Sequence, residues 1–156
     1  MLIEKLKQRN EDESGAELVE FAFVVVLLIT VLYGIITYGM ILAAQSTLTQ
    51  AAADAAQAGL VMGSSPAAVT TAQAQAADDI GWMDRGTCGT SSTSNTVMKC
   101  LAVTEACPSN ASVQCLKVTV IYSYAQSPLF PELPGLGLIT PSTISSTNVV
   151  QLGTVS

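Results

Sequence analysis

The sequence contains no histidine, and charged residues make up only 12% of it, about half the share usual in soluble domains. Histidine is the commonest general base and a frequent zinc ligand, so both kinds of chemistry lack their usual side chain. No motif for an activated nucleophile is present either. One alternative function is a membrane-anchored enzyme, whose candidate acids would be Asp78, Asp79, Asp84 and Glu105. We therefore expect a protein that is not an enzyme and that binds neither a cofactor nor a metal.

Charge is absent from one long stretch, the 24 residues from Phe21 to Ala44. As a helix with a rise of about 1.5 Å per residue, this stretch would reach roughly 36 Å, which is enough to cross a bilayer. A secretory signal peptide is the alternative, but its apolar region typically has about 7 to 15 residues, and no small-x-small cleavage site follows Ile41. The sequence therefore predicts a retained transmembrane segment over about residues 21–44.

The few basic residues are unevenly placed around this span. Lys5, Lys7 and Arg9 precede it, and the next basic residue along the chain is Arg85. Because Lys and Arg gather on the cytoplasmic side of a membrane helix, the N-terminus is predicted in the cytoplasm and everything after about Gln45 outside. The chain beyond the leader is net acidic, so nucleic acid is not an expected partner.

An even number of cysteines falls within one short stretch of this outer part. They are Cys88, Cys100, Cys107 and Cys115. Thiols in an oxidising compartment form disulfides, so two disulfides are predicted, with three pairings possible. The alternative is an all-cysteine zinc site, which is disfavoured because the chain has no Cys-x-x-Cys pair.

The order of polar and apolar segments predicts an α+β protein in which a long N-terminal transmembrane helix continues into a small, disulfide-containing extracytoplasmic head. Its expected parts are a cytoplasmic leader (1–15), the helix (16–60) and the α+β head (61–156). Beyond the span, apolar residues recur at alternating spacings of three and four, the period of a helix. These residues are Ile41, Ala44, Leu48, Ala51, Ala55, Ala58 and Met62. This alanine-rich stripe is expected to pack against its own head or against a neighbouring helix.

A second helix is expected from Pro66 to about Ile80. Ser65 is the expected N-cap, and proline suits the first helical position because its missing N–H is not needed there. The lone Trp82, which follows this helix, is expected in the core because tryptophan is mostly buried, and the alternative is an exposed contact residue.

Strand character is found at 97–103, 113–124 and 143–152. The middle segment alternates most clearly, with a period of two that is typical of a strand with one buried face. Its apolar positions are Leu116, Val118, Val120, Tyr122 and Tyr124.

The start of the apolar run combines three informative residues, Gly15, Glu20 and Phe21. A glycine there leaves the backbone accessible to a membrane peptidase at the cytoplasmic surface. An ionisable residue in a membrane helix costs about 2.5 to 3.5 kcal/mol near the bilayer centre and less near its edge. Glu20 either reaches back to the interface or pairs with a cation, such as the amino group that a cut after Gly15 would leave on Ala16.

This pattern resembles that of type IV prepilins, and within them the tight-adherence (Flp) group. Their prepilins are cut after a glycine and carry glutamate and an aromatic residue at the fifth and sixth mature positions, which Gly15, Glu20 and Phe21 match. The sequence is similar in more detail to the TadE-like pseudopilins, or minor pilins, of that system. The segments that carry this likeness are GAELVEFA at 15–22, YGIITYG at 33–39 and the alanine-rich helix through Ala58.

The resemblance implies a single-pass protein of the inner membrane, cleaved between Gly15 and Ala16 by a prepilin peptidase. It also implies that Glu20 and Phe21 act in assembly with other pilus subunits and with the inner-membrane assembly platform. The head would be periplasmic or extracellular, and the pilus would act in adhesion and biofilm formation. A major pilin is disfavoured because a whole head follows Gly59. The remaining alternative is an uncut binding module tethered to the bilayer.

Overall fold

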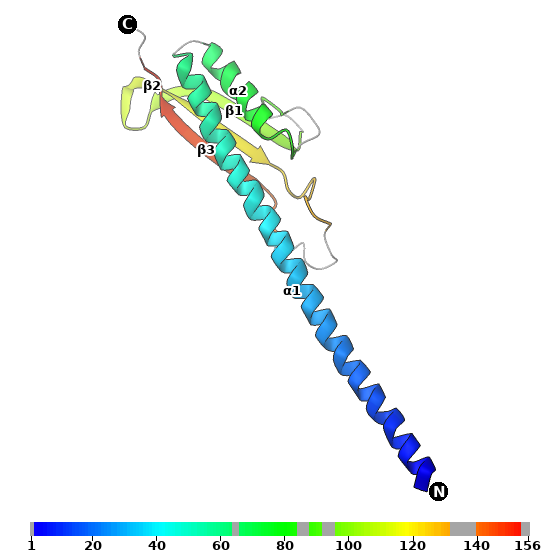
Figure 1. The fold of residues 1–156 in the computed structure, drawn as a ribbon. Coiled ribbons are helices and arrows are strands. Elements are labelled where there is room, and N and C mark those ends of the chain that lie inside the picture. Colours follow the sequence, from blue (N-terminus) through cyan, green and yellow to red (C-terminus); the bar gives the residue numbers. More distant parts are fainter. Residues whose placement is uncertain (1, 64–65, 84–87, 92–95, 132–139, 154–156) are drawn as a thin grey trace. The chain divides into compact units, whose positions relative to one another are not determined.

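The computed structural model describes residues 2–63, 66–83, 88–91, 96–131 and 140–153, with side chains from residue 15 onward. The described chain forms two helices followed by three strands, as Figure 1 shows. They are α1 (Leu2–Val61), α2 (Ala67–Asp79), β1 (Met98–Cys107), β2 (Asn110–Tyr122) and β3 (Ile144–Gln151). The predicted α+β class is therefore confirmed.

Helix α1 begins at Leu2, so it includes the segment predicted as a leader. Leucine, lysine and glutamate recur in that segment beside one glutamine and one arginine, and all five residue types are good helix formers. Local propensity therefore favours a helix well before Ala16, where the sequence pattern placed its start. The helix continues from one compact unit, Met1–Gly39, into a second one, Met40–Ser156.

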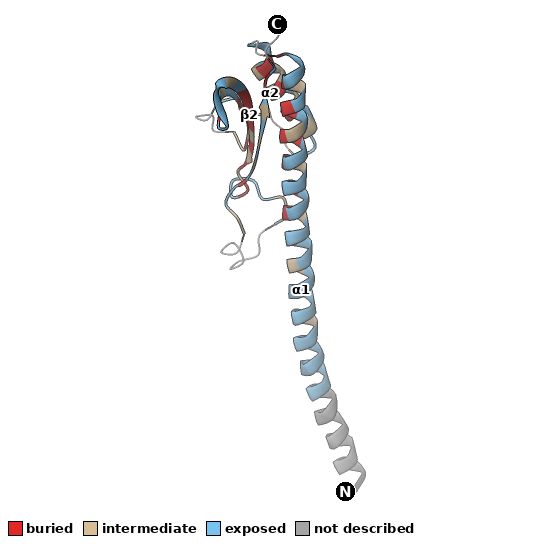
Figure 2. Cartoon of the chain, turned by 90° about the vertical axis from the view of Figure 1, so that its left-hand side faces the viewer, coloured by how far each residue is buried: buried red, intermediate tan, exposed pale blue. Residues whose placement is uncertain are grey.

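In the first unit the helix exposes its apolar side chains. No residue from 15 to 36 is buried, and Figure 2 shows this stretch as largely exposed. Phe23 and Phe21 are 74% and 69% exposed. The hydroxyl of Thr30 donates a hydrogen bond of 2.8 Å to the carbonyl oxygen of Val26, which satisfies this polar group inside the helix. Apolar exposure without a buried stripe suits a helix whose surroundings are themselves apolar.

The second unit contains a three-stranded antiparallel sheet in the order β1-β2-β3. The β1–β2 register shifts between Ala106 and Cys107, whereas the β2–β3 register is uninterrupted. The alternating positions of the central strand lie on one face and are buried, as predicted. They are Leu116, Val118, Val120 and Tyr122, with Tyr124 buried just after the strand.

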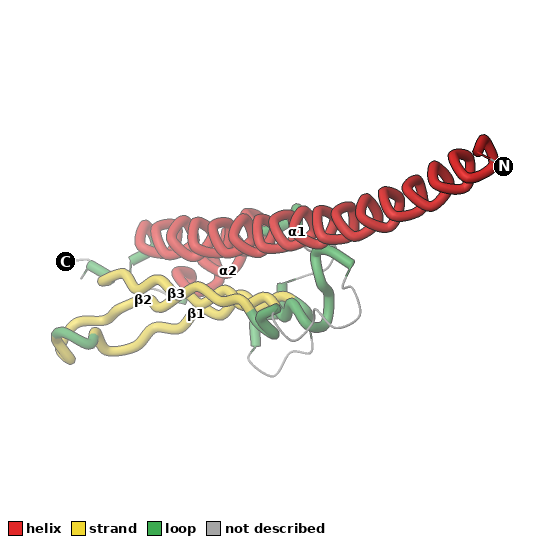
Figure 3. The backbone as a smooth tube through the Cα atoms, turned by 90° about the horizontal axis from the view of Figure 1, so that it is seen from below, coloured by secondary structure: helices red, strands yellow, loops and turns green. Residues whose placement is uncertain are grey.

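The last part of α1 and the whole of α2 cover this buried face of the sheet (Figures 1 and 3). The buried apolar side chains of α1 are Ile41, Ala44, Leu48, Ala51, Ala52, Ala55 and Ala56, and those of α2 are Ala68, Ala72 and Ala76. Small side chains let the two helices and the sheet approach closely. The predicted stripe therefore packs against its own head, while Met62 at its far end is 44% exposed because α1 has already ended.

Gly59 lies where α1 closely approaches β2 and α2. A Cβ added there would overlap the side chain of Leu116, and it would lie 3.0 Å from the carbonyl oxygen of Ala68 and 3.3 Å from Cβ of Ala72. Few real Cβ contacts are this short, so β2 and α2 can reach α1 here only because the residue is glycine.

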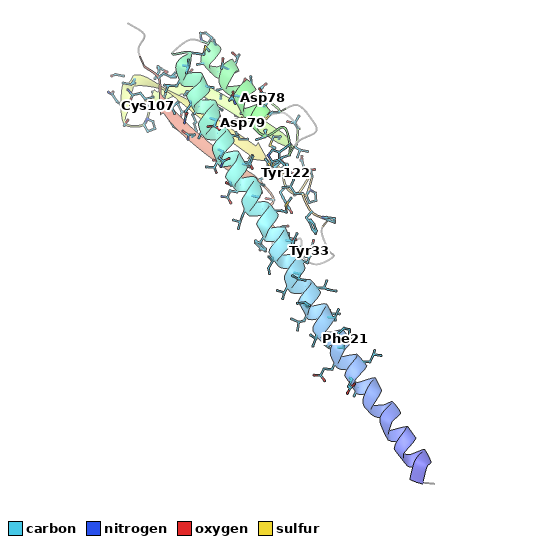
Figure 4. All side chains as sticks on the ribbon, in the orientation of Figure 1. Phe21, Tyr33, Asp78, Asp79, Cys107 and Tyr122 are labelled. Atoms are coloured by element: carbon cyan, nitrogen blue, oxygen red, sulfur yellow. A yellow bond between two sulfur atoms is a disulfide. The ribbon has the colours of Figure 1, made fainter. Side chains whose placement is uncertain are left out.

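Two disulfides hold the head, Cys88–Cys100 and Cys107–Cys115. Each disulfide joins two cysteines that are consecutive in the sequence order of the four, and the Cα atoms of the two pairs are 5.7 and 5.0 Å apart. The first ties residues 88–91 to β1, and the second closes the β1–β2 hairpin, where Figure 4 labels Cys107. All four cysteines are used in disulfides, so the prediction of two disulfides is confirmed. The same sulfur atoms therefore do not serve as four zinc thiolates.

The segment around α2 differs from expectation in two ways. Pro66 occupies the N-cap position rather than the first helical position, and the predicted cap Ser65 lies outside the described residues. Trp82 is 62% exposed, so its predicted core position is wrong. Its neighbour Met83 packs against the core instead, because a turn directs only one of two adjacent side chains inward.

Candidate assembly site on the N-terminal helix

The predicted cleavage site lies within α1, on exposed helix. Gly15 and Ala16 are both exposed. A Cβ added at Gly15 would meet nothing within 4 Å, so packing does not require glycine at this position. Glycine lowers the stability of a helix by about 1 kcal/mol relative to alanine. The helix at Gly15 is therefore accessible and intrinsically weaker than its surroundings.

Glu20 lies one helical turn after Ala16, because residues four apart share a side of an α-helix. Its side chain is exposed, and among the described residues none forms an ion pair with it. The helix that follows is free of charge as far as Ala44. Since no described side chain pairs with this carboxylate, the partners to consider are water at an interface, a new amino terminus on Ala16 and another chain.

Phe21 begins the apolar surface that follows Glu20. Figure 4 shows its side chain projecting from α1. Phe21 and Leu18 are both 69% exposed. The helix from Gly15 to Val61 is long and apolar enough to cross a membrane. These features fit a single-pass membrane protein in which Phe21 meets lipid or another helix.

The described carboxylates among those considered for an anchored enzyme do not all lie on one side of the sheet. Asp78 and Asp79 lie at the end of α2, which packs on the buried face of the sheet. Glu105 lies on the opposite face, where its carboxylate is 3.5 Å from the Nζ atom of Lys117. Asp84 lies outside the described residues. Within the described ranges, no three Cys, Asp or Glu side chains are grouped closely enough to hold a metal.

The sequence pattern did not single out Gly59, where α1 closely approaches β2 and α2. The sequence did contain an indication of its role. Gly59 follows Ala55 by four residues, on the side of the alanine stripe, in a segment whose other residues mostly favour a helix. A glycine in that context usually has a packing reason. The predicted stripe named Ala58 instead, which is only half-buried.

In a comparison with protein families, residues 15–57 match a family described as TadE-like protein. The matched segment contains Gly15, Ala16, Glu20 and Phe21, together with most of the alanine stripe. No curated protein and no solved structure matches the chain significantly. The resemblance inferred from the sequence is confirmed for this segment of the helix.

Proposed function

We propose that this chain, TadE-like over residues 15–57, is a minor pilin-like subunit, or pseudopilin, of a tight-adherence (Flp-type) pilus. It is a structural subunit and not an enzyme. It sits in the inner membrane as a single-pass protein, with its N-terminus in the cytoplasm and its head outside. A prepilin peptidase removes the leader after Gly15, and the mature chain joins or primes a pilus that acts in adhesion and biofilm formation.

One observation carries the proposal. The family match begins at Gly15 and includes Glu20 and Phe21, and the same residues lie on an exposed, otherwise apolar helix. An unburied helix of this kind requires a bilayer or neighbouring helices around it. Gly15 before the span suits cleavage by the peptidase, and the Glu20 carboxylate suits assembly with a neighbouring chain.

The proposed chemistry depends on charge neutralisation. Cleavage after Gly15 leaves a positive amino group on Ala16, one turn from Glu20 in the same chain and equally accessible to a neighbour. In an apolar environment an unpaired carboxylate is unfavourable by a few kcal/mol, so pairing it with a neighbour's amino group favours association. Phe21 and the apolar residues after it then pack against the next helix.

The partners that follow from this proposal are the lipid bilayer, the prepilin peptidase, other pilus subunits and the inner-membrane assembly platform. A tether for an independent binding module would need the bilayer but no peptidase. The state of the N-terminus therefore separates the two functions.

The first test is the intact mass and N-terminal sequence of the protein extracted from membranes of its host, with and without the prepilin peptidase. We expect a peptidase-dependent start at Ala16. Gly15→Leu should abolish processing, whereas Gly34→Leu, a change at another open helix position, should leave it intact. A chain that keeps Met1 in both strains would contradict the proposal and favour the tethered module.

The second test separates assembly from processing. Glu20→Gln removes the charge but keeps the shape, so we expect normal cleavage together with a loss of pilus incorporation, measured by recovery of the subunit in sheared pili. Glu17→Gln is the matched control, since Glu17 is also exposed. Equal incorporation of the two variants would show that the Glu20 charge is not needed.

A further inference from the structure

A shallow apolar hollow lies on the exposed first part of α1. It is lined by Val24, Leu27, Leu28 and Val31, all of them exposed. Their spacing of i, i+3, i+4 and i+7 is that of the four residues that surround an inserted side chain where two helices pack knobs-into-holes. The hollow is therefore shaped for one large apolar side chain from another helix.

The same helix carries a side chain of the kind that the hollow would take. Phe23 is 74% exposed, the highest value among the large apolar residues of the described stretch 15–39. An aromatic ring buries a large area when it packs, and helices in a bilayer associate through such packing because lipid is as apolar as they are. Phe23 lies N-terminal to the hollow on the same rigid helix, so the two can meet only between chains.

The proposed function supplies a second complementary pair on this stretch. Cleavage after Gly15 leaves a positive amino group on Ala16, and the exposed Glu20 carries a negative carboxylate. Opposite charges attract strongly where the surroundings have a low dielectric constant. Two neighbouring chains can therefore be joined by a charge pair as well as by an apolar contact.

The four partners are divided between two sides of the helix. Ala16 and Phe23 are one heptad apart, which places them within about 20° of each other around the axis. Glu20 lies on the side of the hollow, because three of the lining residues follow it at the helical repeat. These residues are Val24, Leu27 and Val31, at four, seven and eleven positions after it. One side thus carries the amino group and the ring, and the other carries the carboxylate and the hollow.

Both pairs also require the same axial shift between neighbouring parallel helices. Glu20 is four residues beyond Ala16, or about 6 Å at the rise of an α-helix. The four lining residues have a mean position of 27.5, which is 4.5 residues beyond Phe23, or about 7 Å. The two shifts agree to about 1 Å. A single placement of the neighbouring helix therefore satisfies both contacts.

The other exposed aromatic residue of the span, Phe21, does not meet these conditions. It would need a shift of 6.5 residues to reach the centre of the hollow, or about 10 Å. It also lies about 140° from Ala16 around the helix axis. The geometry thus distinguishes Phe23 from Phe21, although both are exposed.

We propose that the hollow binds Phe23 of a second copy of this chain, in a parallel contact whose axial shift is set by the Ala16 amino group and the Glu20 carboxylate. Charge complementarity and the agreement of the two shifts support a second copy, because one chain carries both halves of the contact. The inference rests on the proposed function, which supplies the amino group, and adds the packing residue and its position. Because the two sides differ, a pair of chains leaves one hollow and one Phe23 open for a further subunit.

The test is disulfide crosslinking in host membranes between two coexpressed full-length chains that carry different tags. All four native cysteines are paired, so an introduced cysteine is the only free thiol. After oxidation, Phe23→Cys on one chain should crosslink to Leu28→Cys on the other. We expect at least about fivefold more product than with Ile29→Cys, because a disulfide needs Cβ atoms within about 4.5 Å. Leu28 and Ile29 are matched positions, since both are 57% exposed.

A second control concerns the inserted side chain. Phe21→Cys, at a position that is 69% exposed, should give with Leu28→Cys no more product than the Ile29→Cys control. All of these positions are exposed on the first part of α1, so the substitutions leave the packing of the head unchanged. The intact mass of each variant shows separately whether its leader has been removed.

Several results would overturn the inference. Equal yields with Leu28→Cys and Ile29→Cys in a processed chain would do so and leave the pilin assignment standing. Equal yields from Phe21→Cys and Phe23→Cys would refute the axial position. Product between Leu28→Cys and a different protein, without product between the two chains, would show that another subunit fills the hollow. A chain that keeps its leader lacks the Ala16 amino group, and this outcome, visible in the mass alone, would overturn both proposals.

Discussion

Helix α1 passes through two regions in which apolar residues behave in opposite ways. From 15 to 36 the helix carries large apolar side chains, and none is buried, whereas from 41 to 59 alanine is its commonest residue, and most of these alanines are buried. A buried leucine contributes about 1.5 to 3 kcal/mol, and alanine far less. The region with the largest apolar side chains therefore has no buried residue. Apolarity alone does not locate the core, and the first region requires a surrounding that is itself apolar.

The same substitution on the two regions tests this difference most strongly. Leu48 is fully buried, whereas Leu28 is 57% exposed. Leu48→Ala should lower the free energy of unfolding of the head by about 3 kcal/mol, because it removes buried area and leaves a cavity. Leu28→Ala should change it by less than about 0.5 kcal/mol. Thermal unfolding in detergent measures both, and equal effects would refute the distinction.

Removing the Cys88–Cys100 disulfide should have the next largest effect. The crosslink joins residues separated by 12 positions, and opening a loop of this size costs about 3 kcal/mol in the chain-entropy treatment. The double substitution Cys88→Ser with Cys100→Ser should destabilise the head and leave the helicity of residues 15–36 unchanged. Circular dichroism during thermal unfolding distinguishes the two regions. Loss of helicity in the first region would show that the regions are coupled.

Glycines on the two parts of the helix should respond in opposite directions. Gly34→Ala has open space and gains helix propensity, so it should stabilise the helix by up to about 1 kcal/mol. Gly59→Ala forces its Cβ into Leu116 and towards the Ala68 carbonyl oxygen. Despite the same propensity gain, we expect a net loss of about 1 to 2 kcal/mol in head stability. A neutral Gly59→Ala would mean that the Leu116 side chain moves aside freely.

The smallest effect is expected on the outer face of the sheet. Lys117 and Glu105 lie 3.5 Å apart with both side chains 42% exposed, so solvent screens their attraction. Lys117→Ala should change the free energy of unfolding by less than about 0.5 kcal/mol in urea titrations. A larger loss would mean that this face carries stability that its exposure does not suggest.

Regular periodicity allowed most of the secondary structure to be predicted from the sequence. The spacing of Ile41, Ala44 and Leu48 identified the buried stripe of α1, and the alternation from Leu116 to Tyr124 identified the buried face of β2. Both patterns arise from geometry that repeats along a single element. The candidate assembly site followed from the order of glycine, glutamate and aromatic residue in a charge-free context.

Features set by contacts between distant segments were not predictable in the same way. Three disulfide pairings were possible until the β1–β2 register placed Cys107 near Cys115. The exposure of Trp82 depends on a turn that directs Met83 to the core. The position of β1 and β3 at the edges of the sheet depends on strand order, which alternation along one strand does not report.

The position of Gly15 inside a continuous helix sets a condition on proteolysis. A protease binds its substrate in an extended form, so a peptidase that cuts after Gly15 must first unwind the turn that contains it. Opening of this kind is a local unfolding event whose cost depends on nearby helix propensity. A glycine reduces that cost by about 1 kcal/mol relative to alanine, which makes the open form roughly fivefold more populated. The rate at which the peptidase removes the leader would then depend on how often this helical turn unwinds, as well as on how well the peptidase recognises the sequence.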